Sequence, residues 1–191
     1  SASSDGPAWE DITARTQPLQ GEPVRDGDEL ATIMYTSGTT GMPKGVMHSF
    51  ATFAWSMAAV RKRLESDEHS RILSYLPLSH VAERTVVEHN LLASSLHVFF
   101  AESLETFAAD LQRARPTVFF SVPRLWVKFQ QGVLAKMPAQ KLDRLLSIPL
   151  VRHVVRRKVL RALGLDQCRF PAGGAAPMPP DLLRWYARLG L

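Results

Sequence analysis

Cysteine and long apolar segments are almost missing from this chain of 191 residues. Cys168 is the single cysteine, so an internal disulfide framework is excluded and a reducing compartment is favoured. No reactive motif surrounds Cys168, which indicates a buried, inert thiol. The longest uncharged run, residues 45–60, contains His48 and is too short for a membrane span, so we expect a buried helix there. The first residues are acidic and lack an apolar signal segment, which favours a cytoplasmic protein.

Composition indicates an ordinary globular domain without an evident metal site. Hydrophobic residues make up 46% and charged residues 21%, as expected for a chain that folds around one sizeable core. Five histidines lack the spacing of metal ligands and are interpreted as core or surface residues: His48, His69, His89, His97 and His153.

Strand and helix patterns alternate from residue 28 onward. Residues 1–27 are polar, contain several prolines and glycines, and are predicted to form an extended lead-in. Apolar, partly β-branched runs predict strands at 30–36, 71–76, 96–100, 117–121 and 167–171. Helical periodicity predicts helices at 47–63, 80–93, 103–114, 123–136, 139–147, 150–163 and 179–189. Strands separated by helices indicate an α/β fold, with a mostly parallel sheet covered by helices on both faces.

The most informative segment, residues 35–46, reads Tyr-Thr-Ser-Gly-Thr-Thr-Gly-Met-Pro-Lys-Gly-Val. Its glycines let backbone N–H groups approach oxygen atoms, its hydroxyls can donate to phosphate, and Lys44 adds a positive charge. A buried strand is expected before it and a helix up to Leu64 after it, the usual setting of a phosphate loop. The spacing differs from the Walker A pattern, so the phosphate geometry must differ too. A flexible linker is the alternative, which buried flanking elements disfavour.

This loop resembles the phosphate-binding motif of the adenylate-forming superfamily, which contains acyl-CoA synthetases, luciferases and peptide-synthetase adenylation domains. Three further segments extend the resemblance over residues 28–191: Leu73-Ser-Tyr-Leu-Pro-Leu-Ser-His-Val-Ala-Glu-Arg84, Pro116-Thr-Val-Phe-Phe-Ser-Val-Pro-Arg-Leu-Trp126 and Gly173-Gly-Ala-Ala-Pro177. The first two have the form found in long-chain fatty acyl-CoA synthetases. The resemblance implies the acyl-CoA synthetase/luciferase-like fold, with residues 28–191 as part of its large N-terminal domain.

The resemblance also implies roles for the matching residues. The loop would hold the β- and γ-phosphates of ATP through Thr36, Ser37, Gly38, Thr39, Thr40, Gly41 and Lys44. Thr40 would approach Mg²⁺, and Lys44 and His80 would act in catalysis, with His80 beside the acyl carboxylate. Adenine would rest on the segment made of Gly174, Ala175, Ala176 and Pro177.

The residues themselves leave several of these roles open. His80 follows a strand and a proline turn, where ligands bind in parallel sheets, but a residue there can also cap the following helix. Glu83 and Arg84 lie in the first turn of that helix and predict a structural ion pair. The adenine segment also fits an ordinary strand-to-helix turn opened by Pro179. Six bulky apolar residues are interpreted as core residues, with a position beside an acyl tunnel as the less favoured alternative: Val118, Phe119, Phe120, Val122, Leu125 and Trp126.

The implied activity is that of a long-chain fatty acyl-CoA synthetase, which forms an acyl-adenylate from ATP and a fatty acid and then transfers the acyl group to coenzyme A. A carboxylate is already ionised at neutral pH, so a loop rich in donors and lacking acids suits this chemistry. Two alternatives stay open: an enzyme for an aryl or amino acid, and a non-catalytic nucleotide-binding or membrane-docking module. The family's Tyr-Gly-x-Thr-Glu motif is absent, so we expect a fragment with little or no turnover, whose exposed sheet edges favour self-association.

The net charge of +5 is unevenly distributed. Residues 1–30 carry seven acids against two arginines, whereas residues 150–163 carry five cations and no acid. The spacing of this second segment predicts an amphipathic helix with a basic face. That face suits a solvated surface, peripheral contact with an anionic membrane, or the phosphates of coenzyme A. Nucleic acid is not expected as a partner, because no nucleic-acid motif accompanies the charges.

Overall fold

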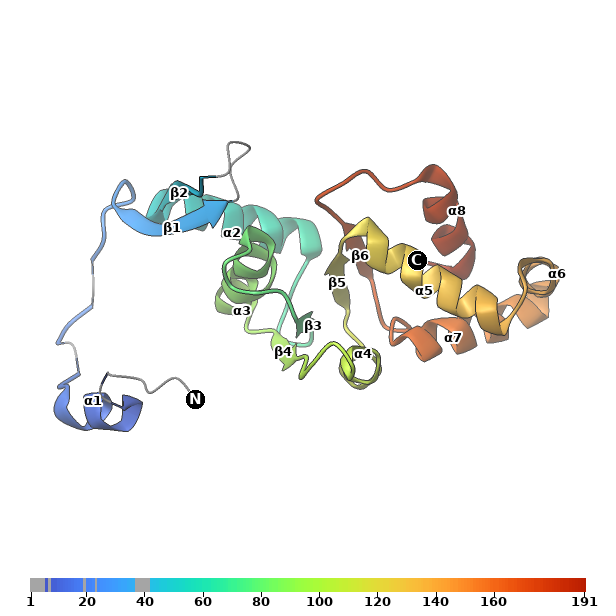
Figure 1. Ribbon diagram of the computed structural model, residues 1–191, viewed down its shortest axis with the longest axis horizontal. Helices are drawn as coiled ribbons and strands as arrows, with labels where there is room; N and C mark the ends of the chain where they lie inside the picture. Colours follow the sequence, from blue (N-terminus) through green and yellow to red (C-terminus); the bar gives the residue numbers. More distant parts are fainter. Residues whose placement is uncertain (1–5, 7, 19, 23, 37–41) are drawn as a thin grey trace.

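A computed structural model gives the fold and describes residues 6, 8–18, 20–22, 24–36 and 42–191 (Figure 1). The chain is a mixed α/β fold with parallel strand pairs, as the sequence predicts. Its strands are β1 (Leu30–Thr36), β2 (Lys44–Ser49), β3 (Arg71–Ser74), β4 (His97–Phe100), β5 (Val118–Ser121) and β6 (Phe170–Gly173). Its helices are α1 (Trp9–Arg15), α2 (Phe50–Leu64), the π-helix η1 (Glu83–Glu88), α3 (His89–Ser94), α4 (Phe107–Ala114), α5 (Pro123–Lys136), α6 (Ala139–Ser147), α7 (Pro149–Leu163) and α8 (Pro180–Leu189).

The segment that follows the predicted phosphate loop is a strand rather than the start of a helix. β1 and β2 pair in antiparallel fashion, with Thr36 opposite Lys44 at the loop end. The uncharged run 45–60 predicts one continuous helix, but pairing with β1 overrides this local preference as far as Ser49. Ser49 then caps α2, because its Oγ accepts a hydrogen bond from the N–H of Thr52 at 3.3 Å. The expected strand–turn–helix setting is therefore wrong: the loop joins two antiparallel strands.

The β1–β2 hairpin and α2 are also more exposed than the sequence predicts. Within β1 the one buried residue is Met34, and α2, described along its whole length, has no buried residue. The expectations of a buried strand at 30–36 and a buried helix at 45–60 are therefore wrong. Instead these elements present a set of exposed large apolar side chains, namely Leu30, Ile33, Tyr35, Val46, Met47, Phe50 and Trp55.

The remaining strands form two parallel pairs, β3 with β4 and β5 with β6. β3 meets β5 at its start, where the Thr117 N–H donates to the Arg71 carbonyl and the Arg71 N–H donates to Thr117 Oγ1, both at 2.9 Å. The ladder does not continue between these fully described strands. Farther along, the Tyr75 hydroxyl oxygen lies 3.0 Å from the Phe120 carbonyl oxygen and 3.0 Å from Ser121 Oγ. A side chain thus takes the place of backbone pairing at the carboxyl ends of β3 and β5.

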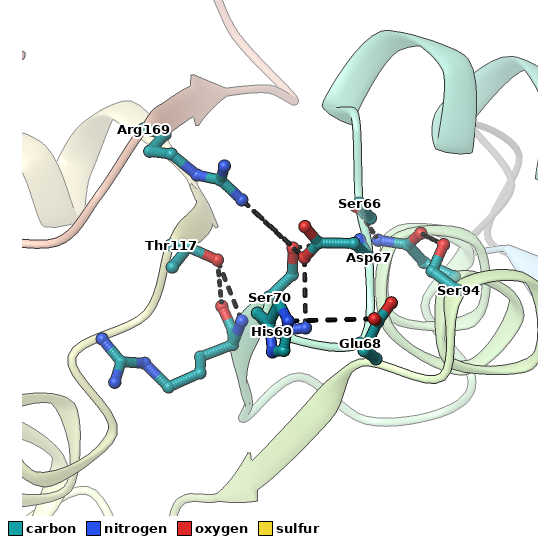
Figure 2. Close-up of polar contacts among 10 residues, drawn as sticks. Ser66, Asp67, Glu68, His69, Ser70, Ser94, Thr117 and Arg169 are labelled. Atoms are coloured by element: carbon teal, nitrogen blue, oxygen red, sulfur yellow. Dashed lines mark hydrogen bonds and ion pairs between the residues drawn. The ribbon is translucent and has the colours of Figure 1, made fainter.

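A polar network joins the strands at their opposite ends, where they begin (Figure 2). Ser70 Oγ donates to the Asp67 carboxylate at 2.6 Å and accepts from the Arg169 guanidinium at 3.3 Å. The Ser70 carbonyl accepts from the His97 N–H at 2.8 Å, and the Thr117 carbonyl accepts from the Arg169 N–H at 2.8 Å. Because these residues precede or open β3, β4, β5 and β6, the network ties the beginnings of all four parallel strands together.

The main core lies between the strands and helices α4, α5, α7 and α8. Its buried residues are Leu73, Leu111, Ala114, Phe119, Trp126, Leu165, Leu182 and Tyr186. Gly164 ends α7 with a φ of 75°, and a Cβ there would lie 2.5 Å from the Leu111 carbonyl oxygen, so α4 and α7 meet closely at this point. Cys168 is partly buried and packs against this core, and burial raises the pKa of its thiol to about 12, which supports the expected inert thiol.

Most of the other predicted boundaries agree with the structure to within a few residues. β6 begins at Phe170, later than the predicted 167, because residues 166–168 form a turn. In that turn Asp166 pairs with Arg115, and the Cys168 N–H donates to the Leu165 carbonyl at 3.1 Å. The lead-in contains the exposed helix α1, which the sequence does not predict. None of the helices in the described residues is long and apolar enough to cross a membrane.

Candidate functional site

A cleft of about 510 Å³ lies between the β1–β2 hairpin and the start of the helix that follows β3. Its lining residues are Met34, Tyr35, Thr36, Val46, His48, Ser79, His80 and Val81. The structure therefore brings together two of the predicted site residues, Thr36 and His80. The described lining has apolar walls, hydroxyls and imidazoles, and it carries no carboxylate. Such a cleft can bind an anion by hydrogen bonds without repelling it.

The predicted phosphate loop begins and ends at the hairpin. At its base Thr36 Oγ1 donates to the Lys44 carbonyl at 3.4 Å. Lys44 is exposed beside Thr36, but it does not line the cleft. Gly45 follows, where a Cβ would lie 2.8 Å from Ile33 Cγ2, so the close pairing of β1 and β2 favours glycine here. The central loop residues lie outside the described part of the chain, and their roles stay predictions: Ser37, Gly38, Thr39, Thr40 and Gly41.

His80 is held by the turn that follows β3. Its N–H donates to the Pro77 carbonyl at 2.8 Å, and its Nδ1 accepts from the N–H of Ala82 at 3.2 Å. Because Nδ1 accepts, the neutral ring carries its proton on Nε2 and can donate from that atom. His80 therefore fits both interpretations: it bonds to the first turn of the helix, and it lines the cleft.

Glu83 fixes this turn from the inside of the protein. It is 2% exposed, and its carboxylate accepts hydrogen bonds from Ser74 Oγ and, at 3.3 Å, from the N–H of Leu76. Its own N–H donates to the His80 carbonyl at 3.0 Å. Burial raises the pKa of Glu83, while the hydrogen bonds from Ser74 and Leu76 oppose that rise. One side chain thus joins the end of β3 to the helical segment that follows His80.

The predicted ion pair between Glu83 and Arg84 is wrong. Arg84 Nε lies 3.1 Å from the carboxylate of Glu88, one turn farther along the helix, and Arg84 Nη2 donates to Thr32 Oγ1 at 3.4 Å. Adjacent residues of a helix point in different directions, so Glu83 reaches β3 and Arg84 reaches β1. These two contacts hold together the elements that form the walls of the cleft.

The segment predicted to receive adenine lies at the carboxyl ends of β5 and β6. The Gly174 N–H donates to the Ser121 carbonyl at 3.1 Å, and a Cβ on Gly174 would lie 2.6 Å from Phe120 Cζ. Ala175 has a φ of 66°, and the residues from 175 to 177 are exposed. None of the residues from 173 to 177 lines the cleft described above. The structure therefore does not join this segment to Thr36 and His80, although it leaves the small residues 175–177 exposed.

Magnesium is predicted at Thr40, which lies outside the described residues. Among the described residues, no three His, Cys, Asp or Glu side chains are grouped closely enough to hold a metal ion. Hydroxyls and imidazoles line the described walls of the cleft, whereas Mg²⁺ prefers carboxylate, phosphate and water oxygens. The described residues therefore do not make up a magnesium site on their own.

A second, apolar recess of about 300 Å³ lies between α2 and the β5–β6 pair. Its lining residues are Ala59, Val60, Arg63, Leu64, Val86, Val118, Phe120 and Ala172. η1, which directly follows the turn at His80, supplies Val86 to this recess. Val118 is buried in the core as predicted, and Phe120 adds an aromatic wall. The helical segment after β3 therefore borders both the polar cleft and an apolar recess.

Tyr75 and Ser121 are site-supporting residues that sequence reasoning missed. Their hydroxyls meet at the carboxyl ends of β3 and β5, between the His80 turn and the Gly174 segment. Burial raises the pKa of the Tyr75 hydroxyl, so it stays protonated and can donate. A tyrosine at the end of an apolar strand was the available signal, since a buried tyrosine hydroxyl needs a partner.

Comparison with known proteins identifies the family. The family model described as AMP-binding enzyme matches residues 2–191. The chain belongs to the AMP-binding enzyme family. It is 34% identical over 196 residues to the long-chain-fatty-acid–CoA ligase ACSBG2 of Xenopus laevis, covering 86% of this chain and 26% of that protein. It is 33% identical over 180 residues to the peroxisomal acyl-CoA ligase 891 of Penicillium roqueforti, covering 81% of this chain and 25% of that protein. The chain thus spans about a quarter of the length of these two relatives.

Solved structures agree with the family. The adenylation domain of carboxylic acid reductase from Segniliparus rugosus, in complex with AMP and a co-purified carboxylic acid, matches with a TM-score of 0.70 and 26% identity, over 94% of this chain and 29% of that one. The N-terminal domain of FACL13 from Mycobacterium tuberculosis matches with a TM-score of 0.63, over 93% of this chain and 39% of that one. At 22% sequence identity, this match shows the fold alone. The acyl-CoA synthetase/luciferase-like fold predicted from the sequence is confirmed.

Proposed function

We propose that this chain belongs to a long-chain fatty acyl-CoA synthetase that uses ATP to convert a fatty acid into its acyl-adenylate. The observation that carries this proposal is the shared cleft, because Thr36 at the base of the loop and His80 after β3 line one space with no carboxylate in its described lining. The ligase relatives support the substrate class. The adenylation domain solved with AMP and a carboxylic acid supports the pairing of these two ligand types.

The first half-reaction forms a bond between a carboxylate oxygen and the α-phosphorus of ATP, and breaks the bond from that phosphorus to the bridging oxygen, which leaves with pyrophosphate. The carboxylate is already ionised, so no general base is needed. Thr36 and Lys44 would hold the β- and γ-phosphates and stabilise the charge on pyrophosphate. His80 would donate from Nε2 to an oxygen of the carboxylate or the α-phosphate. In the second half-reaction the coenzyme A thiol gives its proton to solvent and its sulfur bonds to the acyl carbon, while the bond from that carbon to the phosphate oxygen breaks and AMP leaves.

The apolar recess supports a long hydrocarbon substrate. It adjoins the helical segment that begins at the cleft, and Arg63 is the one charged residue in its described lining. An acid whose carboxylate is bonded by His80 could place its chain along this segment toward Val86. The exposed surface of residues 174–177 would receive adenine.

Pyrophosphate exchange into ATP, measured on the full-length product of the gene, tests this function. We expect exchange with a long-chain fatty acid and little with an aryl acid or an amino acid. His80→Ala is expected to lower the exchange rate roughly 100-fold, the usual loss for a donor to a reacting oxygen. His69→Ala is the matched control, because His69 is exposed and lies at the opposite end of β3 (Figure 2).

The possible results distinguish two questions: whether the protein forms adenylates, and which class of acid it activates. Exchange with an aryl or amino acid alone would overturn the fatty acyl assignment while keeping adenylate formation. No exchange with any acid would favour a non-catalytic module. The isolated 191 residues are expected to show little or no turnover, because they do not contain the Tyr-Gly-x-Thr-Glu motif.

A further inference from the structure

One face of α7 combines exposed apolar and basic side chains. Leu150 is 86% exposed and Val154 is 67% exposed. Three exposed cations lie at helical spacing from them, so the five side chains share one side of the helix. These five residues, which we call the α7 outer face, are Leu150, Val154, Arg157, Lys158 and Arg161. The opposite side packs on α6 and α8 through Val155, Val159 and Leu163.

Acidic side chains do not neutralise this region. Between Arg124 and Leu165, all of which the structure describes, ten cations accompany a single acid, Asp143. The Asp143 carboxylate lies 2.7 Å from the guanidinium of Arg188, outside this region. None of the ion pairs among the described residues includes a cation of the α7 outer face. Covering this face with an apolar segment would therefore desolvate three cations that no carboxylate of this region pairs with, which is unfavourable.

An apolar groove of about 180 Å³ borders the outer face. Its walls come from the last turns of α5 and from α7: Val133, Lys136, Met137, Val155, Lys158, Val159 and Ala162. Lys136 and Lys158 are its charged residues. A lysine stem can lie along apolar groups while its ammonium group reaches outward to an anion. The groove and the outer face together present hydrocarbon and positive charge side by side.

We propose that the α7 outer face docks on an anionic phospholipid surface, with α7 lying parallel to the plane of the membrane. The cations would meet lipid phosphates, and Leu150 and Val154 would enter the boundary of the acyl chains. The two apolar residues lie in the first half of the face and the three cations in its second half, so one side of α7 offers both hydrocarbon and positive charge to a membrane surface. The inference rests on α7 and its neighbours, and it does not depend on the proposed enzymatic function.

Vesicle sedimentation of the 191-residue chain tests this docking. Vesicles of phosphatidylcholine alone are compared with vesicles of phosphatidylcholine mixed with phosphatidylglycerol, at low and high salt. We expect binding that needs the anionic lipid and weakens with salt. The variant Arg157→Gln/Arg161→Gln is expected to partition roughly 30-fold less, the combined effect of two basic residues near such a surface. Leu150→Ser/Val154→Ser is expected to reduce binding to the same vesicles.

The control variant is Arg61→Gln/Lys62→Gln, which removes two exposed cations from the last turn of α2 and changes the net charge equally. It is expected to bind like the wild type, and thermal unfolding checks that all variants stay folded. If both charge variants lose the same amount of vesicle binding, the binding depends on net charge alone, and the proposal is overturned. Equal binding of the wild type to neutral and anionic vesicles would assign the binding to the apolar side chains of the hairpin and α2, and would overturn the proposal. Absence of binding by the wild type would also overturn the proposal. Release by millimolar glycerol phosphate would reveal a site for a single phosphate instead of a bilayer.

Discussion

The carboxylate of Glu83 accepts a hydrogen bond from the N–H of Leu76 at 3.3 Å, across the turn that carries His80. A second hydrogen bond, from Ser74 Oγ, fixes the same carboxylate to the end of β3. His80 is therefore positioned by a buried residue that does not line the cleft. This arrangement separates the group that would touch substrate from the group that holds it in place.

Replacing Glu83 by glutamine is expected to change how stability depends on pH. Burial raises the pKa of Glu83 above its ordinary value of 4.5, so its stabilising contribution is complete below that value and is lost as the pH rises through the native pKa. Glu83→Gln has no charge to lose, so its melting temperature relative to wild type should rise between pH 4 and pH 7. Glu68→Gln, at an exposed position, should show no such trend. A relative melting temperature that is flat or falls for Glu83→Gln would contradict the buried, raised-pKa carboxylate.

Replacing Lys44 by alanine is expected to weaken binding of Mg-ATP. An ammonium beside the predicted phosphate loop would make a charge-assisted contact worth about 1.5–3 kcal/mol, so affinity should fall roughly 10- to 100-fold. Calorimetric titration of wild type and Lys44→Ala measures this, with Lys141→Ala on α6 as the control. If neither wild type nor variant binds, the 191 residues do not preform the loop, and the same comparison belongs in the full-length protein. Equal affinities would show that Lys44 does not contact the nucleotide.

Gly174→Ala is expected to destabilise the fold by about 1–3 kcal/mol, because its Cβ would lie 2.6 Å from Phe120 Cζ and force that ring to move. Gly132→Ala is the matched control. It lies within α5 with nothing near its Cβ position, and it should stabilise by about 0.5–1 kcal/mol. Urea unfolding measures both. If both substitutions change the free energy of unfolding in the same direction, the contact with Phe120 does not constrain the segment predicted to receive adenine.

Tyr75→Phe is expected to cost about 1–2 kcal/mol, since it leaves the Phe120 carbonyl and Ser121 Oγ without their hydroxyl partner. Tyr35→Phe removes an exposed hydroxyl and should change the free energy of unfolding by less than about 0.5 kcal/mol. Chemical denaturation of the two variants makes the comparison. Similar small effects would mean that the ends of β3 and β5 are held without Tyr75.

Cys168 is expected to resist alkylation in the folded chain. Burial raises the pKa of its thiol to about 12, so at pH 8 almost none of it is the reactive thiolate. Iodoacetamide treatment followed by mass measurement should show no adduct until the chain is unfolded in urea. Rapid labelling under native conditions would contradict the burial of this thiol.

Local signals predicted those elements whose limits are set by their own residues. α5 and α6 begin and end where the sequence predicts, because Pro123 and Pro138 mark their starts. β2 could not be predicted in this way, since the segment from 45 to 49 becomes a strand by pairing with β1 and no residue within it shows that partner. Ser49 is a typical helix-capping residue and could have predicted the start of α2. The uncharged run 45–60 favoured an earlier start instead.

The candidate site was predictable in its parts and less so in their arrangement. The motif resemblance pointed to Thr36 and His80, and the structure has both in the lining of one cleft, with His80 after β3 as predicted; their roles stay predictions. Which of two adjacent residues faces the strand was not predictable, because η1 is a π-helix whose extra residue per turn shifts side-chain directions. Glu88, the partner of Arg84, lies at the i,i+4 spacing that a helix indicates, whereas the partners of Glu83 lie outside the helix, on Ser74 and Leu76.

The network around Ser70 and Thr117 has a consequence for how such proteins diversify. Hydrogen bonds fasten the four parallel strands to one another where they begin, far from the turn that carries His80. The ends that would meet a substrate can therefore accumulate substitutions without loosening the sheet. Laboratory evolution toward new acids should accordingly tolerate wide variation at Leu78, Ser79 and Val122, while the fastened ends stay constant.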